Sequence, residues 1–158
     1  MVDRRSLVVR RMRAEDVDGM VLLGQAMHGE SAFSERVFSS EKLGSLLHHY
    51  VNTPEHCFGA VAYIGPDMVG MFAGYTTDYF FGPELVACDL FWYVSPAHRG
   101  SRAGLKLLRS FESWAKSRGV SEISAGVSTA VAFERTGALL QRLGYTQVGG
   151  NYKRVVVG

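Results

Sequence analysis

The spacing of apolar side chains changes along the chain between a helical period and a strand period. In three long segments, apolar residues recur every three or four positions and would line one face of an amphipathic helix. Between the second and third segments, three apolar runs are typical of strands. The helical segments are residues 13–28, 39–50 and 102–118, and the strand-like runs are residues 57–64, 68–77 and 85–94. The last run is apolar on both faces, so helices should cover it on both sides.

The two ends of the chain complete the pattern. A short strand is expected at Leu7–Met12, and a further strand and helix at residues 121–129 and 131–144. Residues 145–148 and 152–157 flank Gly149-Gly150-Asn151, a turn sequence that predicts a terminal β-hairpin. The expected order is β-α-α-β-β-β-α-β-α-β-β. It predicts a mixed α/β fold that forms one domain over residues 1–158, without repeats or a linker.

Composition and charge narrow the class of protein. A hydrophobic fraction of 47% and a mean hydropathy of +0.03 are those of an ordinary globular domain. The net charge of +2 is too small to indicate a nucleic-acid partner. Cys57 and Cys88 lack the spacing of metal ligands, so we expect no metal and a reducing compartment.

The sequence also lacks the marks of export or membrane insertion. The first 16 residues contain no long apolar core, so we expect no signal peptide. No apolar run approaches the ~20 residues that cross a bilayer. We therefore predict a cytoplasmic protein without a membrane partner.

The junction between residues 85–94 and 102–118 carries the first sign of a ligand. The first N–H groups of a helix lack intrahelical partners, and its dipole adds positive charge there, so small side chains at this end allow phosphate to bind. The small residues here are Gly100, Ser101, Ala103 and Gly104, with Arg99 and Arg102 adding charge. This loop suits a diphosphate. The sequence has neither G-x-x-x-x-G-K-[ST] nor G-x-G-x-x-G after its first strand, which disfavours a nucleoside triphosphatase and a dinucleotide dehydrogenase.

The same junction, "LFWYVSPAHRGSRAGLKLL", resembles the signature segment of the GNAT superfamily of acetyl-CoA-dependent N-acyltransferases. That segment is a strand ending in Val-x-Pro, then [R/Q]-x-x-G-x-[G/A], then a helix. Arg99 and Gly104 match the first and last motif positions, whereas Arg102 replaces the usual middle glycine. The opening "VVRRMRAED" and the closing "LLQRLGY" also resemble the family, so the resemblance covers nearly the whole chain.

The resemblance implies acetyl-CoA as co-substrate, with its diphosphate on the loop from Arg99 to Gly104. In the family, pantetheine lies between the diverging fourth and fifth strands, and a backbone N–H of the fourth strand donates to the thioester carbonyl. The matching positions run from Trp92 to Val94, and we expect Val94 to be the donor. Such a donor stabilises the charge that develops on the oxygen when an amine attacks.

An attacking amine must be neutral, which calls for a general base. The family often has a Glu on the fourth strand and a Tyr on the last helix, but the matching residues here are Cys88, beside Asp89, and Leu140. Tyr145 or Tyr152 could act as the acid in place of that Tyr, or no acid is needed, because a thiolate is a tolerable leaving group. Packing is the simpler role for Tyr145, which leaves Tyr152 as our candidate.

The acceptor amine should bind near residues 27–33, between the first two helices, if the resemblance holds. His28 and Glu30 could bind or deprotonate the amine there; alternatively, Ser31 caps the helix and Glu30 is solvated. Tyr79 could line the same pocket, although packing of Tyr79, Phe80 and Phe81 against the core is the simpler expectation.

These observations predict an N-acetyltransferase that acts on a primary amine of a small molecule or a protein. The missing Glu and Tyr leave one alternative, a catalytically silent acyl-CoA-binding or sensor domain. A nucleic-acid-binding module is disfavoured, because the helix at residues 102–118 lacks paired aromatics and dense charge. The apolar terminal strand could pair between two copies in a homodimer.

Overall fold

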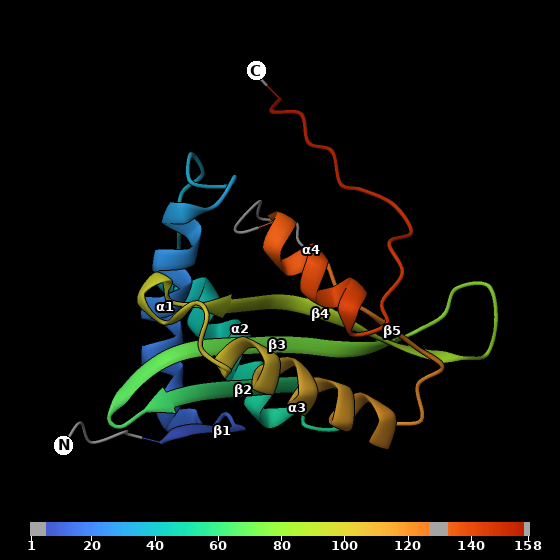
Figure 1. Cartoon of the computed structure of the whole chain (residues 1–158), viewed down its shortest axis with the longest axis horizontal. Helices are drawn as coiled ribbons and strands as arrows, with labels where there is room; N and C mark the ends of the chain where they lie inside the picture. Colours follow the sequence, from blue (N-terminus) through green and yellow to red (C-terminus); the bar gives the residue numbers. More distant parts are fainter. Residues whose placement is uncertain (1–5, 127–132, 157–158) are drawn as a thin grey trace.

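A five-stranded sheet forms the centre of the computed structural model, which describes residues 6–126 and 133–156. The strands lie in chain order, and the first four are antiparallel to their neighbours, whereas β5 is parallel to β4. Their bounds are β1 Leu7–Arg11, β2 Cys57–Ile64, β3 Asp67–Asp78, β4 Leu85–Val94 and β5 Glu122–Ser124. Figure 1 shows this sheet with the helices arranged around it.

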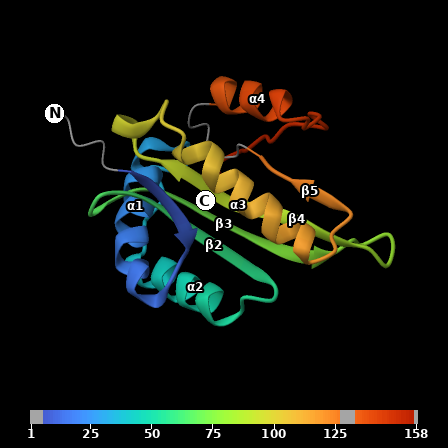
Figure 2. The same cartoon turned by 60° about the horizontal axis from the view of Figure 1, so that its bottom comes forward.

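Helices cover both faces of the sheet (Figure 2). Helices α1 (Val17–Glu30) and α2 (Ser40–Asn52) pack on one face, and α3 (Ala103–Ser117) and α4 (Phe133–Arg142) on the other. Two short 3₁₀ helices, η1 (Ala14–Asp16) and η2 (Pro96–His98), precede α1 and α3. Because both faces are covered, the middle strands are apolar on both sides, as expected for residues 85–94.

A buried carboxylate fixes the turn from β1 into α1. Asp16 accepts two hydrogen bonds from the Arg10 guanidinium, at 2.7 and 2.9 Å, and one from the Tyr63 hydroxyl at 2.7 Å. The Arg13 N–H donates a fourth at 2.7 Å. Burial alone would raise the pKa of Asp16, but the hydrogen bonds from Arg10 and Tyr63 bring it below its usual value. The network thus attaches the start of α1 to the edge of the sheet.

Strand β4 is irregular halfway along its length. Ala73 of β3 pairs with Phe91, whereas the next residue, Gly74, pairs with Asp89, so Leu90 is an extra residue in β4. This is a β-bulge, which bends a strand and increases its twist. In the described part of the chain, β5 pairs only with Val86–Cys88, before the bulge. Among residues 6–126 and 133–156, nothing pairs with the second half of β4 on the side facing away from β3, and this side is called the open side below.

Most predicted elements are confirmed, and the fold is the predicted single mixed α/β domain. Strands β2 and β4 have the predicted bounds, and Ser39 caps α2 by accepting a hydrogen bond from the Lys42 N–H at 3.1 Å. The strand predicted at residues 121–129 is shorter, ending at Ser124, and its residues 127–129 lie outside the described residues. The predicted helix at 131–144 begins at Phe133, and its residues 131–132 also lie outside them.

The terminal hairpin is the prediction that the structure corrects. Residues 145–156 form neither helix nor strand. Val148, Tyr152 and Val156 are 95%, 98% and 90% exposed, so these apolar positions of the two expected strands have no surface to pack against. A two-stranded hairpin without such packing is marginal in water, which explains why the turn sequence alone does not form one.

Candidate functional site

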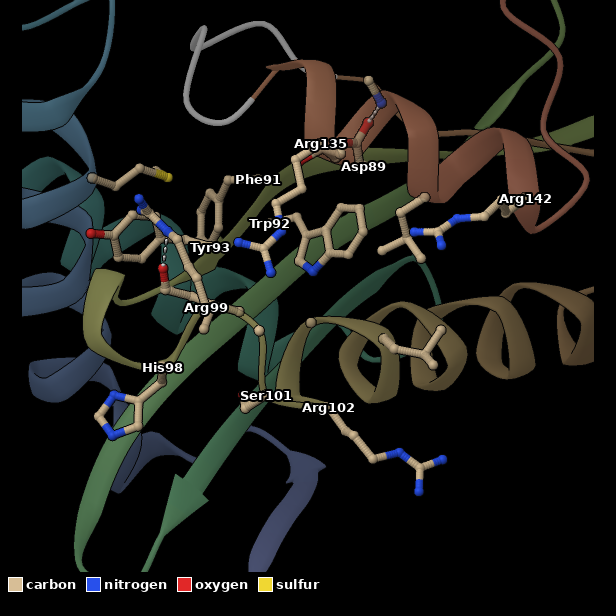
Figure 3. A pocket seen from close by; sticks show the side chains of 18 of the residues that line it. Asp89, Phe91, Trp92, Tyr93, His98, Arg99, Ser101, Arg102, Arg135 and Arg142 are labelled. Atoms are coloured by element: carbon tan, nitrogen blue, oxygen red, sulfur yellow. Dashed lines mark hydrogen bonds between the residues drawn. The ribbon is translucent and has the colours of Figure 1, made fainter.

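A cavity of about 350 Å³ lies beside the open half of β4, between the start of α3 and α4. Figure 3 shows it with residues from both helices and from β4 around it. Its lining includes Phe91, Trp92, Tyr93 and Val94 of β4, Arg99, Gly100, Ser101, Arg102 and Gly104 of the following loop and α3, and Arg135, Thr136, Leu139 and Arg142 of α4. The cavity thus contains most of the predicted diphosphate loop and the predicted thioester donors.

The backbone of β4 presents N–H groups to this cavity. Ser95 donates its N–H to the Val69 carbonyl at 2.9 Å, so Ser95 points toward β3. Backbone groups alternate in direction along a strand, so those of Val94 and Trp92 point away from β3. The side chain of Arg99 confirms this for Val94, because its Nε donates to the Val94 carbonyl at 3.0 Å. The N–H groups of Trp92 and Val94 therefore lie on the open side of the strand.

The loop before α3 brings backbone groups close to the cavity. Gly100 has a φ of +95°, which side-chain-bearing residues rarely adopt, and a Cβ there would lie 3.3 Å from Arg135 Nη2. The N–H groups of the first helical turn, beginning at Ala103, have no partner within the helix, although the Ser101 hydroxyl accepts from Ala103 at 3.3 Å. This end of α3 can bind an anion.

Arg102 replaces the usual glycine of the motif without strain. Its φ is −81°, which any residue adopts, so no glycine is needed there. In Figure 3 its side chain points away from the cavity, so the guanidinium lies at the rim. The cation beside the loop is instead Arg135 of α4, which lines the cavity and whose Nη2 would lie 3.3 Å from a Cβ on Gly100.

Most charged residues that line the cavity are basic. Four arginines line it, two from α4 and two from the loop, and Asp89 is the one carboxylate among the described lining residues. Asp89 Oδ1 accepts a hydrogen bond from the Gly126 N–H at 3.2 Å, and burial raises the pKa of Asp89. Arg135 and Arg142 were not predicted from the sequence. Their spacing with Leu139 on one helical face was the available signal.

Glu30 has a different environment from the one expected. It forms an ion pair with Arg99, with Arg99 Nη1 2.5 Å from Glu30 Oε1, and its Oε2 accepts a hydrogen bond from the Tyr93 hydroxyl at 2.6 Å. The hydrogen bond from Arg99 lowers the pKa of Glu30, and Tyr93 adds to this against the effect of burial. The carboxylate lies behind the cavity lining, where it holds two lining residues.

Comparison with known proteins identifies the fold and the family. The model of the acetyltransferase (GNAT) family matches residues 25–145, which include the cavity and its loop. The chain belongs to this family. No curated protein sequence matches significantly.

Solved structures with the fold of this GNAT family member cover nearly its whole length. An aminoglycoside acetyltransferase from an uncultured soil metagenomic sample is 21% identical, with a TM-score of 0.71, 96% of this chain covered and 99% of that chain. A ribosomal-protein-alanine N-acetyltransferase from Brucella melitensis biovar Abortus 2308 is 14% identical, with a TM-score of 0.69 and coverages of 97% and 99%. AAC(6')-Iy, in complex with the bisubstrate analogue CoA-S-monomethyl-acetylneamine, is 15% identical, with a TM-score of 0.73 and coverages of 95% and 99%.

Three residues predicted for the site of this GNAT family member lie away from the cavity lining. His28 packs its ring against Phe38, with centroids 5.5 Å apart. Tyr79 lies on the exposed β3–β4 loop with Phe80, which is 84% exposed, so these aromatics do not pack against the core. Tyr152 is 98% exposed on the terminal segment. Their predicted roles in acceptor binding and acid catalysis stay predictions.

Tyr145 and Ser31 have the simpler structural roles expected from the sequence. Tyr145 packs against the core, which is its simpler expected role, and burial raises the pKa of its hydroxyl to about 12. Ser31, which follows α1, donates its hydroxyl to the His28 carbonyl at 2.8 Å, as expected of a cap.

In residues 6–126 and 133–156, no group of three or more His, Cys, Asp or Glu side chains could hold a metal. No helix within these ranges is long and apolar enough to cross a membrane.

Proposed function

We propose that this acyltransferase moves an acetyl group from acetyl-CoA to a primary amine of a small molecule or protein. The observation that carries the proposal is one cavity bordered by both the open side of β4 and the free N-terminus of α3. The first can donate hydrogen bonds to an extended amide-containing chain, and the second can hold a diphosphate. Pantetheine and diphosphate are the two successive parts of CoA that need these sites.

The residues of the cavity fit such a ligand. The first turn of α3 and Arg135 would hold the diphosphate, with Gly100 leaving room for close approach. The open half of β4 would pair with the pantetheine amides. Acetyl-CoA supplies the activated acetyl group as a thioester. Val94, or Trp92 one pleat earlier, would donate its N–H to the thioester oxygen, which gains negative charge as the amine attacks.

The protein would also contribute to the reaction rate by orienting the amine and the thioester. Holding an amine beside a thioester in attack geometry accounts for a large part of such rate enhancements. The neighbours named above include enzymes whose acceptors are an aminoglycoside and a ribosomal protein. Both acceptor classes carry primary amines, and we therefore propose to test both.

The direct test is acyl transfer with a panel of amines. Purified protein is mixed with acetyl-CoA and aminoglycosides, polyamines or peptides with a free N-terminal Ala, and free thiol and acceptor mass are followed. We expect amine-dependent thiol release with an acetylated acceptor. Binding of acetyl-CoA without transfer to any acceptor would instead support a silent acyl-CoA-binding domain. That second candidate draws on Cys88 and buried Leu140, which replace the usual Glu and Tyr.

A further inference from the structure

A closed ring of contacts joins the end of β4 to the end of α1. Arg99 Nε donates to the Val94 carbonyl at 3.0 Å, and Arg99 Nη1 lies 2.5 Å from Glu30 Oε1. The other oxygen of Glu30 accepts from the Tyr93 hydroxyl at 2.6 Å. Tyr93 and Val94 are consecutive in the chain, so four residues enclose the last peptide groups of β4.

The ring is partly shielded from water. Tyr93 is 3% exposed, and the side chains of Arg99 and Glu30 are only 24% and 27% exposed. The Arg99 guanidinium also lies over the Tyr93 ring, 5.4 Å from its centroid. Charge-assisted hydrogen bonds in such surroundings are stronger and better oriented than those of exposed ion pairs. The ring therefore restricts the backbone at the end of β4.

We infer that Glu30 is a positioning residue, which holds Arg99 and Tyr93 so that the Val94 N–H keeps a fixed direction toward the cavity. The inference rests on the proposed function, in which this N–H donates to the thioester oxygen. It also changes the role expected for Arg99. Its motif position suggested that Arg99 binds the diphosphate. Its guanidinium instead contacts the Val94 carbonyl, the Glu30 carboxylate and the Tyr93 ring.

A general base is the competing role for Glu30, and the geometry disfavours it. Both carboxylate oxygens already accept hydrogen bonds, from Arg99 and Tyr93. Those bonds stabilise the ionised form, so the carboxylate has a reduced tendency to take a proton. A carboxylate with these partners suits a fixed anchor.

A double-mutant cycle tests the ring through steady-state kinetics. We expect Glu30→Ala and Arg99→Met each to lower kcat about ten-fold, and the double variant to lower it about ten-fold as well, because either change opens the same ring. The KM for acetyl-CoA should change less than about three-fold in Glu30→Ala, since the diphosphate loop is intact. A double variant that loses about a hundred-fold, the product of the single effects, would overturn the inference.

The conservative variant separates anchoring from base catalysis. The amide oxygen of Glu30→Gln can still accept one of the two hydrogen bonds, so its kcat should lie between those of wild type and Glu30→Ala. A base would lose its function equally in both variants, and equal losses would overturn the inference. The matched control is the exposed pair Arg13–Glu15, at 3.6 Å, where Arg13→Met and Glu15→Gln should leave kcat unchanged.

A measurement without substrate tests the positioning role of Glu30 separately from the proposed acetyl transfer. In ¹H–¹⁵N spectra of the ligand-free protein, Glu30→Ala and Arg99→Met should shift the Val94 amide resonance in the same direction, and Glu15→Gln should not move it. An unmoved Val94 resonance would overturn the ring. If the wild-type protein transfers no acetyl group, the proposed function fails, while this spectrum still decides whether Glu30 orients Val94.

Discussion

At the scale of the residue, the carboxylates of Glu30 and Asp16 each form an ion pair with an arginine, but the two carboxylates differ in their exposure to water. Glu30 retains 27% exposure of its side chain and lies behind the cavity. Asp16 is 2% exposed and accepts hydrogen bonds from Arg10, Tyr63 and the Arg13 backbone. A buried carboxylate in a complete network stabilises little by its charge alone, yet removal of that charge weakens the hydrogen bonds from Arg10, Tyr63 and the Arg13 backbone together.

Because the Arg10 side chain is 27% exposed, water can solvate it, and Asp16→Asn should lower the free energy of unfolding by about 2 kcal/mol through weaker hydrogen bonds. The folded-state pKa of Asp16 is lowered, so its contribution is present above the ordinary Asp pKa and is lost as pH falls through the folded-state value. The difference between wild type and variant should then shrink below about pH 4. Urea unfolding at pH 7 and pH 3.5 measures both effects. Glu15→Gln, an exposed neighbour, is the control, and equal losses in the two variants would contradict the network.

At the scale of the element, the two ends of α3 offer a matched comparison. Gly100 precedes the helix with a φ of +95°, and Gly119 follows it with a φ of +76°. An alanine at either position is strained by about 1–2 kcal/mol. Only at Gly100 would the new Cβ also approach Arg135, at 3.3 Å, and enter the region where we place the diphosphate.

Gly100→Ala should weaken binding of acetyl-CoA about ten-fold, whereas Gly119→Ala should leave affinity unchanged while it lowers Tm to a similar extent. Calorimetric titration and thermal melting of both variants supply the comparison. A similar loss of affinity in both would mean that general destabilisation, and not the loop, controls binding.

Elements were predicted well from the sequence where turn residues flank them, and less well where the backbone is irregular. Gly65-Pro66 separates β2 from β3, so the end of β2 is clear from sequence. The bulge at Leu90 has no local sequence signal, because the run around it is apolar on both faces. Yet the cavity lies beside the part of β4 that follows this bulge. The Glu30–Arg99 pair joins segments distant in the chain, and local patterns carry no sign of it. The loop from Arg99 to Gly104 could be singled out because its signal is local, and its diphosphate role stays a prediction.

At the scale of the whole molecule, the terminal segment lies apart from the sheet, as Figure 1 shows. Its contact with the rest of the chain includes Lys153, whose Nζ donates to the Ala32 carbonyl beside α1. Val148, Tyr152 and Val156 are almost fully exposed. The segment therefore adds little buried area. The homodimer and the cytoplasmic location stay predictions.

Deletion of residues 148–158 should consequently change Tm by less than about 2 °C, because less than about 1 kcal/mol of packing is removed. Thermal melting of the shortened and full-length chains tests this. A hairpin packed on the sheet would bury these apolar side chains, and its loss would lower Tm by about 10 °C or more. Such a drop would restore the terminal hairpin expected from the sequence.

The account depends most on the identity of the cavity as an acyl-CoA site. Calorimetric titration of the wild-type protein with acetyl-CoA, and separately with pantetheine, measures this directly. We expect one acetyl-CoA per chain and binding of pantetheine at least about ten-fold weaker, because pantetheine lacks the diphosphate that α3 and Arg135 would hold. Equal affinities for the two compounds, or no binding of either, would contradict the assignment of the cavity.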